Sequence, residues 1–195
     1  ELIESLKGQG FTFGEVTLHV GVGTFLPVKD EDAAQHAMHT EHFSVTRQSV
    51  ENLLANIGNI VAVGTTSVRT LESLYFLGEK VSENPAIEES ELRVEQWEPY
   101  NREHTLSTVE ALTALLQWLD AKGLDRVHSH TRIMIAPGYT FRIVKAIVTN
   151  FHQPKSTLLL LVSAFIGSDW SRVYDFALEN GFRFLSYGDS SLLIP

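Results

Sequence analysis

A polar loop between two apolar segments constrains the fold of this chain more than any other sequence feature. The loop is Thr149-Asn150-Phe151-His152-Gln153-Pro154-Lys155-Ser156-Thr157, and it lies between the β-branched run 143–148 and the apolar run 158–165. This order predicts a buried strand, a loop and a buried helix. Buried polar groups cost free energy unless they find partners, and α/β proteins bind ligands at the carboxyl ends of their strands. We therefore interpret the loop as part of a binding site.

Predicted strands alternate with predicted helices along most of the chain, which indicates an α/β fold with mostly parallel pairing. We expect residues 1–195 to form a single α/β domain with flanking helices, whose sheet is open or resembles an incomplete barrel. Residues 80–105 are acid-rich without a clear period, and we expect them to be an irregular insertion at the surface. The predicted strands are 13–20, 42–45, 59–63, 132–136, 141–148 and 182–187, and the predicted helices are 1–10, 30–39, 47–56, 68–77, 108–119, 158–166 and 173–180. We expect Thr46 to cap the helix 47–56, Ser107 or Thr108 to cap the helix 108–119, and Gly123 to follow that helix.

The composition is that of a folded protein without cysteine. Apolar residues make up 44% of the 195 residues and aromatic residues 10%, which allows a hydrophobic core. The absence of cysteine excludes disulfides and thiolate metal sites and favours a cytoplasmic location. No apolar stretch is long enough to span a bilayer, and no signal peptide is visible. Because the first residue is Glu1, we expect the natural N-terminus to be missing.

The net charge of −9 argues against nonspecific nucleic-acid binding, but the charges are unevenly distributed. Residues 79–120 contain ten acidic and three basic side chains, whereas residues 126–155 contain five basic side chains, three histidines and no acidic side chain. The second segment could present a locally positive face. A solvated patchwork of charges explains the pattern equally well.

Two further segments follow predicted strands. Gly64-Thr65-Thr66-Ser67 precedes a helix, whose first backbone N–H groups attract anions, and Arg69 and Glu72 could reach the same ligand. The alternative is an ordinary helix cap, because Thr and Ser are favoured there. Gly21-Val22-Gly23 lacks the third glycine of the dinucleotide fingerprint, since Leu26 takes that place, and it indicates only a tight bend or a close backbone approach.

Two groups of side chains suit proton transfer or anion binding. The segment 36–42 contains three histidines and Glu41, but it lacks the zinc-binding spacing, so we favour an imidazole–carboxylate pair over a metal site, with a surface helix end as the alternative. In the 149–157 loop, His152 could titrate near neutral pH, and Lys155 would place a positive charge beside a helix start. Asp189 and Tyr187 would join this edge if the last strand is parallel to its neighbours.

These motifs together resemble one family. The matching segments, in order, are residues 19–28, 36–41, 62–73 and 149–158, completed by Pro137-Gly138-Tyr139 and Ser186-Tyr187-Gly188-Asp189. They resemble the S-adenosylmethionine:tRNA ribosyltransferase-isomerases of queuosine biosynthesis. The resemblance covers the chain except about residues 80–126, and it corresponds to roughly the C-terminal half of a family member. Gln153 and Ser190-Ser191 stand where the family usually has Leu and Ala-Met.

The resemblance implies an enzyme that moves the ribosyl part of S-adenosylmethionine onto the 7-aminomethyl-7-deazaguanine of tRNA and isomerises it to epoxyqueuosine, while adenine and methionine leave. Such chemistry needs a base, a donor for the developing alkoxide or the departing adenine, and exclusion of water. The implied partners are S-adenosylmethionine as cosubstrate and a tRNA anticodon loop whose target base leaves the stack. The resemblance implies no metal, redox cofactor or membrane contact, and it leaves the oligomeric state open.

The resemblance also suggests roles for individual residues. His39 and Glu41, with His152 as a rival, are candidates for proton transfer, and Lys155 is the candidate for stabilising oxyanion charge or holding the methionine carboxylate. The candidates for cosubstrate binding are His19, Gly23, Thr65, Thr66, Arg69, Asn150, Ser156, Thr157 and Asp189, and those for tRNA phosphate contacts are Arg126, Arg132, Arg142 and Lys145.

Two other functions stay open from sequence. One is an α/β enzyme that acts on a small phosphorylated sugar through the same helix starts; its ligand affinity would depend less on salt than tRNA affinity does. The other is a noncatalytic module that docks tRNA, for which S-adenosylmethionine would give no thermal stabilisation.

Overall fold

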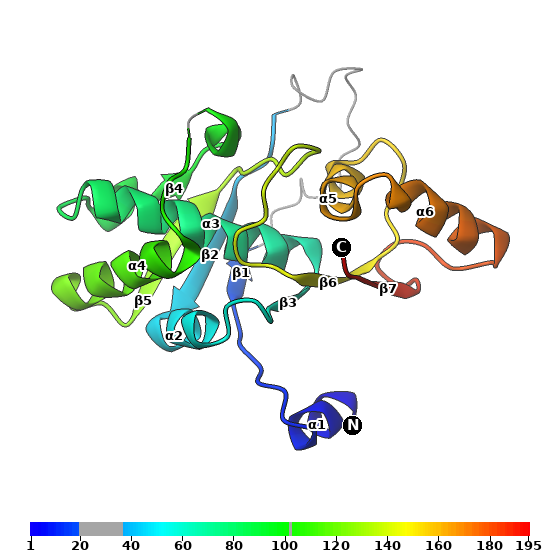
Figure 1. Ribbon diagram of the computed structural model, residues 1–195, viewed down its shortest axis with the longest axis horizontal. Coiled ribbons are helices and arrows are strands. Elements are labelled where there is room, and N and C mark those ends of the chain that lie inside the picture. Colours follow the sequence, from blue (N-terminus) through cyan, green and yellow to red (C-terminus); the bar gives the residue numbers. More distant parts are fainter. Residues whose placement is uncertain (20–36, 102) are drawn as a thin grey trace.

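The computed structural model describes residues 1–19, 37–101 and 103–195, and its strands form two sheets that lie beside one another (Figure 1). The strands are β1 (Thr17–His19), β2 (Glu41–Thr46), β3 (Val61–Val63), β4 (Arg93–Val94), β5 (Arg126–Thr131), β6 (Ala146–Asn150) and β7 (Ser190–Leu193). The helices are α1 (Leu2–Gly8), α2 (Arg47–Ala55), α3 (Thr65–Glu83), α4 (Thr108–Lys122), α5 (Thr157–Ile166) and α6 (Asp169–Glu179), with short 3-10 helices at Glu89–Glu91 and Glu98–Tyr100.

The two sheets mix parallel and antiparallel pairing. Sheet A has the strand order β1-β2-β5-β4 and sheet B the order β3-β6-β7. Only β3–β6 and β4–β5 are parallel, whereas β1–β2, β2–β5 and β6–β7 are antiparallel. The α/β class with flanking helices is confirmed, but the mostly parallel sheet is confirmed only in part, and the described strands form two open sheets instead of one barrel-like sheet. The order of elements along a chain does not by itself fix strand direction, and sheet A can be antiparallel because one of its faces is solvated.

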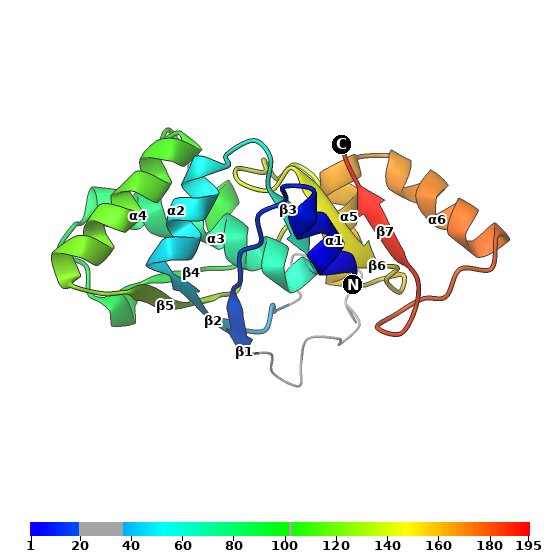
Figure 2. The same cartoon turned by 90° about the horizontal axis from the view of Figure 1, so that it is seen from below.

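Helix α3 connects the two sheets and carries much of the core. It starts after Gly64, whose φ of 89° suits glycine and whose N–H donates to the Val148 carbonyl of β6. The helix continues past Gly78, where we expected an end. A Cβ at Gly78 would lie 2.1 Å from the Ala111 carbonyl oxygen of α4, so glycine is required there for close packing of α3 on α4. Helices α2, α3 and α4 cover one face of sheet A (Figure 2), whereas α1 stands apart from the other elements (Figure 1) and buries no residue.

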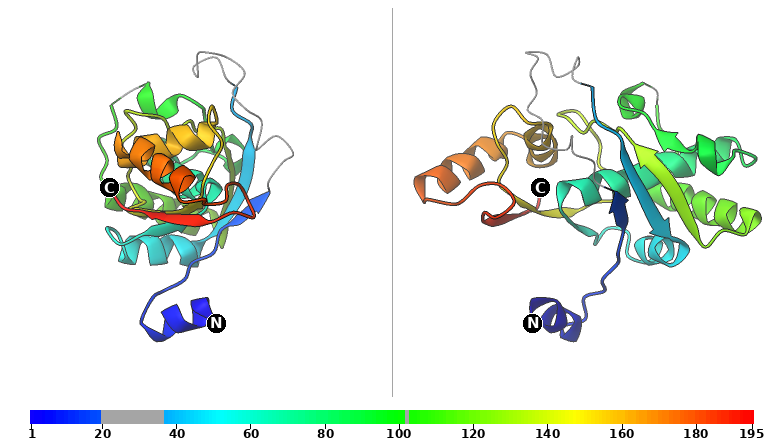
Figure 3. Two further views of the ribbon diagram at one scale, coloured as in Figure 1. Left: turned by 90° about the vertical axis from the view of Figure 1, so that its right-hand side faces the viewer. Right: turned by 180° about the vertical axis from the view of Figure 1, so that it is seen from behind.

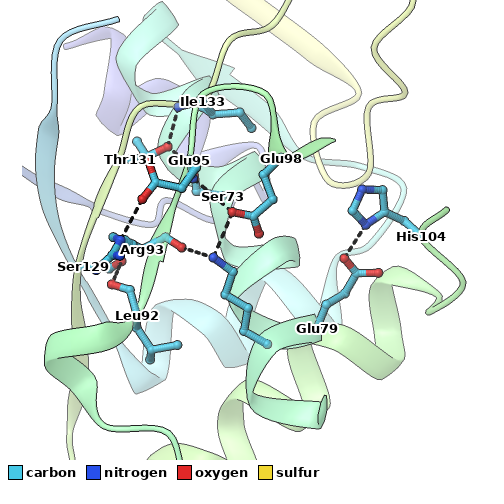
Figure 4. A network of polar contacts seen from close by, with 11 residues as sticks. Ser73, Glu79, Leu92, Arg93, Glu95, Glu98, His104, Ser129, Thr131 and Ile133 are labelled. Atoms are coloured by element: carbon cyan, nitrogen blue, oxygen red, sulfur yellow. Dashed lines mark hydrogen bonds and ion pairs between the residues drawn. The ribbon is translucent and has the colours of Figure 1, made fainter. Parts of the chain in front are cut away.

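The segment 80–105 is less irregular than we expected. Residues 80–83 finish α3, and β4 pairs in parallel with β5, which buries Leu92 and Val94 in the core. Polar contacts tie the segment to α3 and β5 (Figure 4). Lys80 Nζ donates to the Arg93 carbonyl and to Glu98, and Ser129 Oγ donates to the Leu92 carbonyl over 2.8 Å. The prediction of an irregular surface segment is therefore wrong for β4, because a strand of two residues in an acid-rich segment is too short to show a periodic pattern.

Helix caps agree well with the sequence, but several strand limits do not. Thr46 and Ser107 cap α2 and α4 through their side chains, and Gly123 ends α4 in the left-handed conformation, as expected. The predicted strands 132–136 and 182–187 are wrong: β5 ends at Thr131, and the last strand is β7. In β3, only the central residue is buried. No helix in the described ranges is long and apolar enough to cross a membrane.

Candidate active site

Three polar side chains from two distant segments of the chain meet at one end of β2. Glu41 Oε1 lies 2.8 Å from Arg69 Nη1 and 2.9 Å from His39 Nε2, and the latter two nitrogens are 3.5 Å apart. Glu41 and Arg69 are only 1% and 3% exposed, whereas His39 is partly exposed. The expected imidazole–carboxylate pair is thus present, and Arg69 joins it.

The surrounding backbone fixes this cluster. Glu41 is the first residue of β2 and faces the core, because β2 alternates between buried Glu41 and exposed His42. Arg69 projects from the second turn of α3, and its Nε donates to the Ile133 carbonyl over 3.1 Å. The segment before β2 is held at Met38, whose N–H donates to Gln96 Oε1 and whose carbonyl accepts from Arg132 Nε. Sequence reasoning gave no sign of the last two contacts, which span 58 and 94 residues.

The ion pair between the buried Glu41 and Arg69 leaves some of their hydrogen-bonding atoms without a partner among the described residues. Burial lowers the pKa of the Arg69 guanidinium, and the negative charge of Glu41 counteracts that effect. Glu41 Oε2 and Arg69 Nη2 are buried and have no hydrogen-bond partner among the residues that the structure describes. Such atoms are costly and rare in folded proteins. They mark the cluster as a place where polar groups of a ligand would be favourable.

The geometry assigns different tasks to the members of the cluster. The carboxylate of Glu41 accepts from Arg69 and orients the His39 ring by accepting from Nε2–H, a tautomer inferred from the contacts. The other ring nitrogen, Nδ1, has no hydrogen-bond partner among the described residues. An imidazole oriented by a carboxylate, with its second nitrogen free, can accept a proton from a substrate.

A second group of candidate residues lies at the carboxyl edge of sheet B. Because Val63 of β3 pairs with Val148 of β6, the start of α3 at Thr65 lies beside the end of β6 at Asn150. Asn150 Nδ2 donates to the Asp189 carbonyl over 3.3 Å. This edge connects to the first cluster through α3, since Arg69 lies one turn after Thr65. The structure thus brings the 149–157 loop and the Gly64–Ser67 turn to one edge.

His152 is held in the neutral form. Thr149 Oγ1 lies 3.0 Å from His152 Nε2, and the backbone N–H of His152 donates to the Tyr174 hydroxyl. Burial lowers the pKa of His152 from 6.5 to about 4. An imidazole with this pKa is a weak base at pH 7, which makes His39 the stronger candidate for proton transfer.

The lowered pKa of His152 predicts a specific pH dependence. Its folded-state pKa lies below the unfolded value, so the unfolded chain binds more protons between pH 6.5 and 4, and stability contributed by neutral His152 is lost as the pH falls through that window. We expect the ring to titrate near pH 4 by NMR and His152→Gln to flatten the stability profile in this window. An NMR midpoint near 6.5 would contradict this.

Lys155 and the start of α5 form the exposed part of the edge. Lys155 is exposed and has a φ of 58°, a left-handed conformation that costs a non-glycine residue about 1–2 kcal/mol. Ser156 caps α5 by accepting from the Leu159 N–H, and Thr157 is buried. The expected strand–loop–helix order is confirmed. Strain at an exposed lysine beside a helix start is typical of functional sites.

Other sequence-based expectations need correction or stay untested. Glu72 does not reach a ligand with Arg69, because its carboxylate accepts from the backbone N–H groups of residues 142–144 and from Tyr139. Asp189 lies at the carboxyl end of β6 because β7, which starts there, is antiparallel to β6. The carboxylate of Asp189 pairs with Arg183. Gly23 and His36 lie outside the described residues.

The four cations that we assigned to tRNA do not gather in one patch. Arg126 is the first residue of β5 and Arg132 follows its last residue, so the two lie about 20 Å apart at the rise of an extended strand. Arg142 packs over the Tyr75 ring, 4.9 Å from its centroid, while Lys145 is exposed before β6. Their contact with tRNA stays a prediction. Of the two departures from the family pattern, Ser191 Oγ donates to the Thr149 carbonyl, and Gln153 is exposed.

The described residues contain no group of three His, Cys, Asp or Glu side chains that could hold a metal ion. Fold and site together define a mixed α/β protein with a buried guanidinium–carboxylate–imidazole cluster, an arrangement suited to acid–base chemistry. A family model described as "Queuosine biosynthesis protein" matches residues 1–193, and the chain belongs to this family.

Individual relatives agree with this assignment. The S-adenosylmethionine:tRNA ribosyltransferase-isomerase of Cereibacter sphaeroides is 39% identical over 198 residues, which cover 100% of this chain and 44% of that protein. The protein of the same name from Caulobacter vibrioides is 40% identical, over 99% of this chain and 42% of the relative. The crystal structure of S-adenosylmethionine tRNA ribosyltransferase from Thermotoga maritima has a TM-score of 0.57 at 30% identity and covers 99% of this chain and 48% of that one. This chain thus spans less than half the length of these relatives.

Proposed function

We propose that this chain forms part of an enzyme that transfers the ribosyl moiety of S-adenosylmethionine to the 7-aminomethyl-7-deazaguanine of tRNA and isomerises it to epoxyqueuosine, with release of adenine and methionine. The match of residues 1–193 to the queuosine biosynthesis family carries this proposal. The names of the relatives support it, since each is a tRNA ribosyltransferase-isomerase or ribosyltransferase that uses S-adenosylmethionine. We further propose that the chain is one α/β domain, which the hydrophobic cluster of described residues from both sheets supports, and that the protein acts in the cytoplasm.

The His39–Glu41–Arg69 cluster is suited to the first step of this reaction. The sulfonium of S-adenosylmethionine acidifies the ribose carbon next to it, and a base must remove that proton before adenine leaves. His39 Nδ1 takes this proton in our proposal, while Glu41 orients the ring and stabilises the resulting imidazolium. The unpartnered Arg69 Nη2 is available as a donor to a substrate oxygen.

The edge of sheet B is suited to hold the cosubstrate. The start of α3 at Thr65 and Thr66 offers backbone N–H groups, and Lys155 offers a positive charge beside α5. In our proposal these groups bind the methionine carboxylate or stabilise a developing alkoxide, and Asn150 and Asp189 line the same edge.

A direct assay tests the proposed function. The intact protein is incubated with S-adenosylmethionine and tRNA that carries the 7-aminomethyl-7-deazaguanine precursor, and the digested nucleosides are analysed by mass spectrometry. We expect epoxyqueuosine together with free adenine and methionine. Unchanged precursor, in a preparation that is folded and binds S-adenosylmethionine, would refute the proposal.

Two substitutions at Lys155 separate backbone strain from charge. Lys155→Gly removes the left-handed strain and should leave stability equal or up to about 1 kcal/mol higher, whereas Lys155→Ala keeps the strain. Both remove the ammonium, so both should lower turnover by the same factor, at least about tenfold, while Lys155→Arg retains more activity. Normal turnover in Lys155→Gly would exclude a role for the charge.

A further inference from the structure

The outer face of sheet A carries half of the eight histidines of the chain. His19 of β1 pairs with His42 of β2, which pairs with His130 of β5, and His130 pairs with Arg93 of β4. Directly paired residues on neighbouring strands point to the same side of a sheet. A row of three imidazoles and one guanidinium therefore crosses all four strands.

A second row lies next to the first. His128 lies two residues before His130 in β5, so its side chain faces the same side of the sheet, and it pairs with Ser44 of β2. Arg126, at the start of β5, faces this side as well. A cleft of about 630 Å³ lies over this face, lined by the four histidines together with Ser90, Ser129 and Glu89. Within the described ranges, no α-helix covers this face, because α2, α3 and α4 all pack on the opposite one (Figure 3, right), and the short 3-10 helix Glu89–Glu91 borders the cleft.

The rings of the first row are suited to stacking. The centroids of His42 and His130 are 5.2 Å apart, and His42 is exposed. Burial lowers the pKa of His130, and the neighbouring His42 and Arg93 lower it further, whereas Glu95 opposes this shift. The ring of His130 is therefore mainly neutral at pH 7 and presents an aromatic surface. The permanent positive charges on this face are those of Arg93 and Arg126, whose side chains are 50% and 42% exposed. Each forms an ion pair with a solvent-exposed carboxylate, Arg93 with Glu95 and Arg126 with Asp125, and a phosphate would have to replace that partner.

The histidine face adjoins the candidate active site. His42 follows Glu41 in β2, so the two side chains leave the same strand on opposite faces at neighbouring positions. A polymer that lies on the outer face can reach around the end of β2 towards His39. Aromatic rings and cations on an exposed four-stranded sheet are an arrangement that binds unpaired nucleotides.

We propose that the outer face of sheet A binds unpaired nucleotides of the tRNA substrate, with a base stacked on His42 and His130 and adjacent phosphates on Arg93 and Arg126. This inference rests on the proposed function, because it names the surface that holds the substrate of that reaction. It also revises the tRNA contacts expected from sequence: Arg126 is retained, Arg93 is added, and His19 lies with the nucleotide-binding rings.

The test is a binding titration of the intact protein with a fluorescently labelled anticodon stem–loop RNA, in the presence of EDTA so that metal binding by the histidines does not contribute. His42→Ala/His130→Ala should weaken RNA binding at least about tenfold, and His42→Phe/His130→Phe should restore it, because a phenyl ring still stacks. Arg126→Ala should lower the slope of log affinity against log salt by about one, and Arg172→Ala on α6, exposed and remote from sheet A, should not.

The outcomes separate this inference from the proposed function. If the unaltered protein binds the RNA and the alanine pair binds it equally well, the histidine face is not the docking surface, although the tRNA reaction stands. If the phenylalanine pair binds as weakly as the alanine pair, stacking is refuted. If the unaltered protein binds no RNA, both the inference and the tRNA substrate are wrong. Circular dichroism and S-adenosylmethionine affinity, both expected to be unchanged, show that each variant is folded.

Discussion

Glu41→Gln should destabilise the protein by about 3–5 kcal/mol and lower turnover at least about a hundredfold. The substitution keeps the shape of the side chain but leaves the buried charge of Arg69 without its partner, 2.8 Å away. It also replaces the charged acceptor that orients His39 with a neutral amide, which no longer stabilises a protonated imidazole. Urea denaturation measures the first effect, and formation of the modified nucleoside in a single turnover measures the second.

A second variant separates stability from chemistry. In Glu41→Gln/Arg69→Met, no unpaired charge remains, so most of the lost stability should return while turnover stays low. Glu51→Gln is the matched control, because Glu51 also pairs with an arginine, Arg47, but at the surface, where such pairs contribute little. Two results together would contradict both roles of the cluster: a change in unfolding free energy for Glu41→Gln no larger than that for Glu51→Gln, and normal turnover. The Glu41–Arg69 pair would then contribute little to stability, and the cluster would not be the catalytic site.

Glu72→Ala should cost at least about 4 kcal/mol of unfolding free energy, which places it among the most damaging substitutions of this chain. Glu72 is fully buried, and its carboxylate accepts from the N–H groups of Arg142, Ile143 and Val144 and from the Tyr139 hydroxyl, all within 3.0 Å. Burial raises the pKa of Glu72, and these four donors oppose that shift. Alanine would leave the donors unpaired in the interior.

Denaturation and amide hydrogen exchange measure this effect. In the milder variant Glu72→Gln, the amides of residues 142–144 should exchange faster than in the unaltered protein, because the loop before β6 loses acceptors. The control is Glu110→Ala, which removes a carboxylate that also accepts a backbone N–H, that of Ser107, but at an exposed cap. A loss for Glu72→Ala as small as that for Glu110→Ala would mean that water replaces the carboxylate.

The sequence placed many local features correctly. The caps Thr46, Ser107 and Gly123 depend on contacts within five residues, and each was predicted from residue type and spacing. The His39–Glu41 pair is of the same kind, since its members are two residues apart. The order of strand, polar loop and helix around residues 149–157 also followed from the apolar pattern alone. Short-range interactions of this kind are encoded by the neighbouring residues themselves.

The tertiary structure decided what joins these pieces. Arg69 was expected to hold a ligand, and it pairs with Glu41, 28 residues away. Glu72 was expected to reach the same ligand, but its carboxylate accepts from the backbone of a loop 70 residues further along the chain. The sequence also did not show whether neighbouring strands pair in parallel or antiparallel, because an apolar strand can be buried in either arrangement. Periodicity shows which side chains are buried, whereas only the packed chain determines which buried charges face each other and which histidines share one face of sheet A.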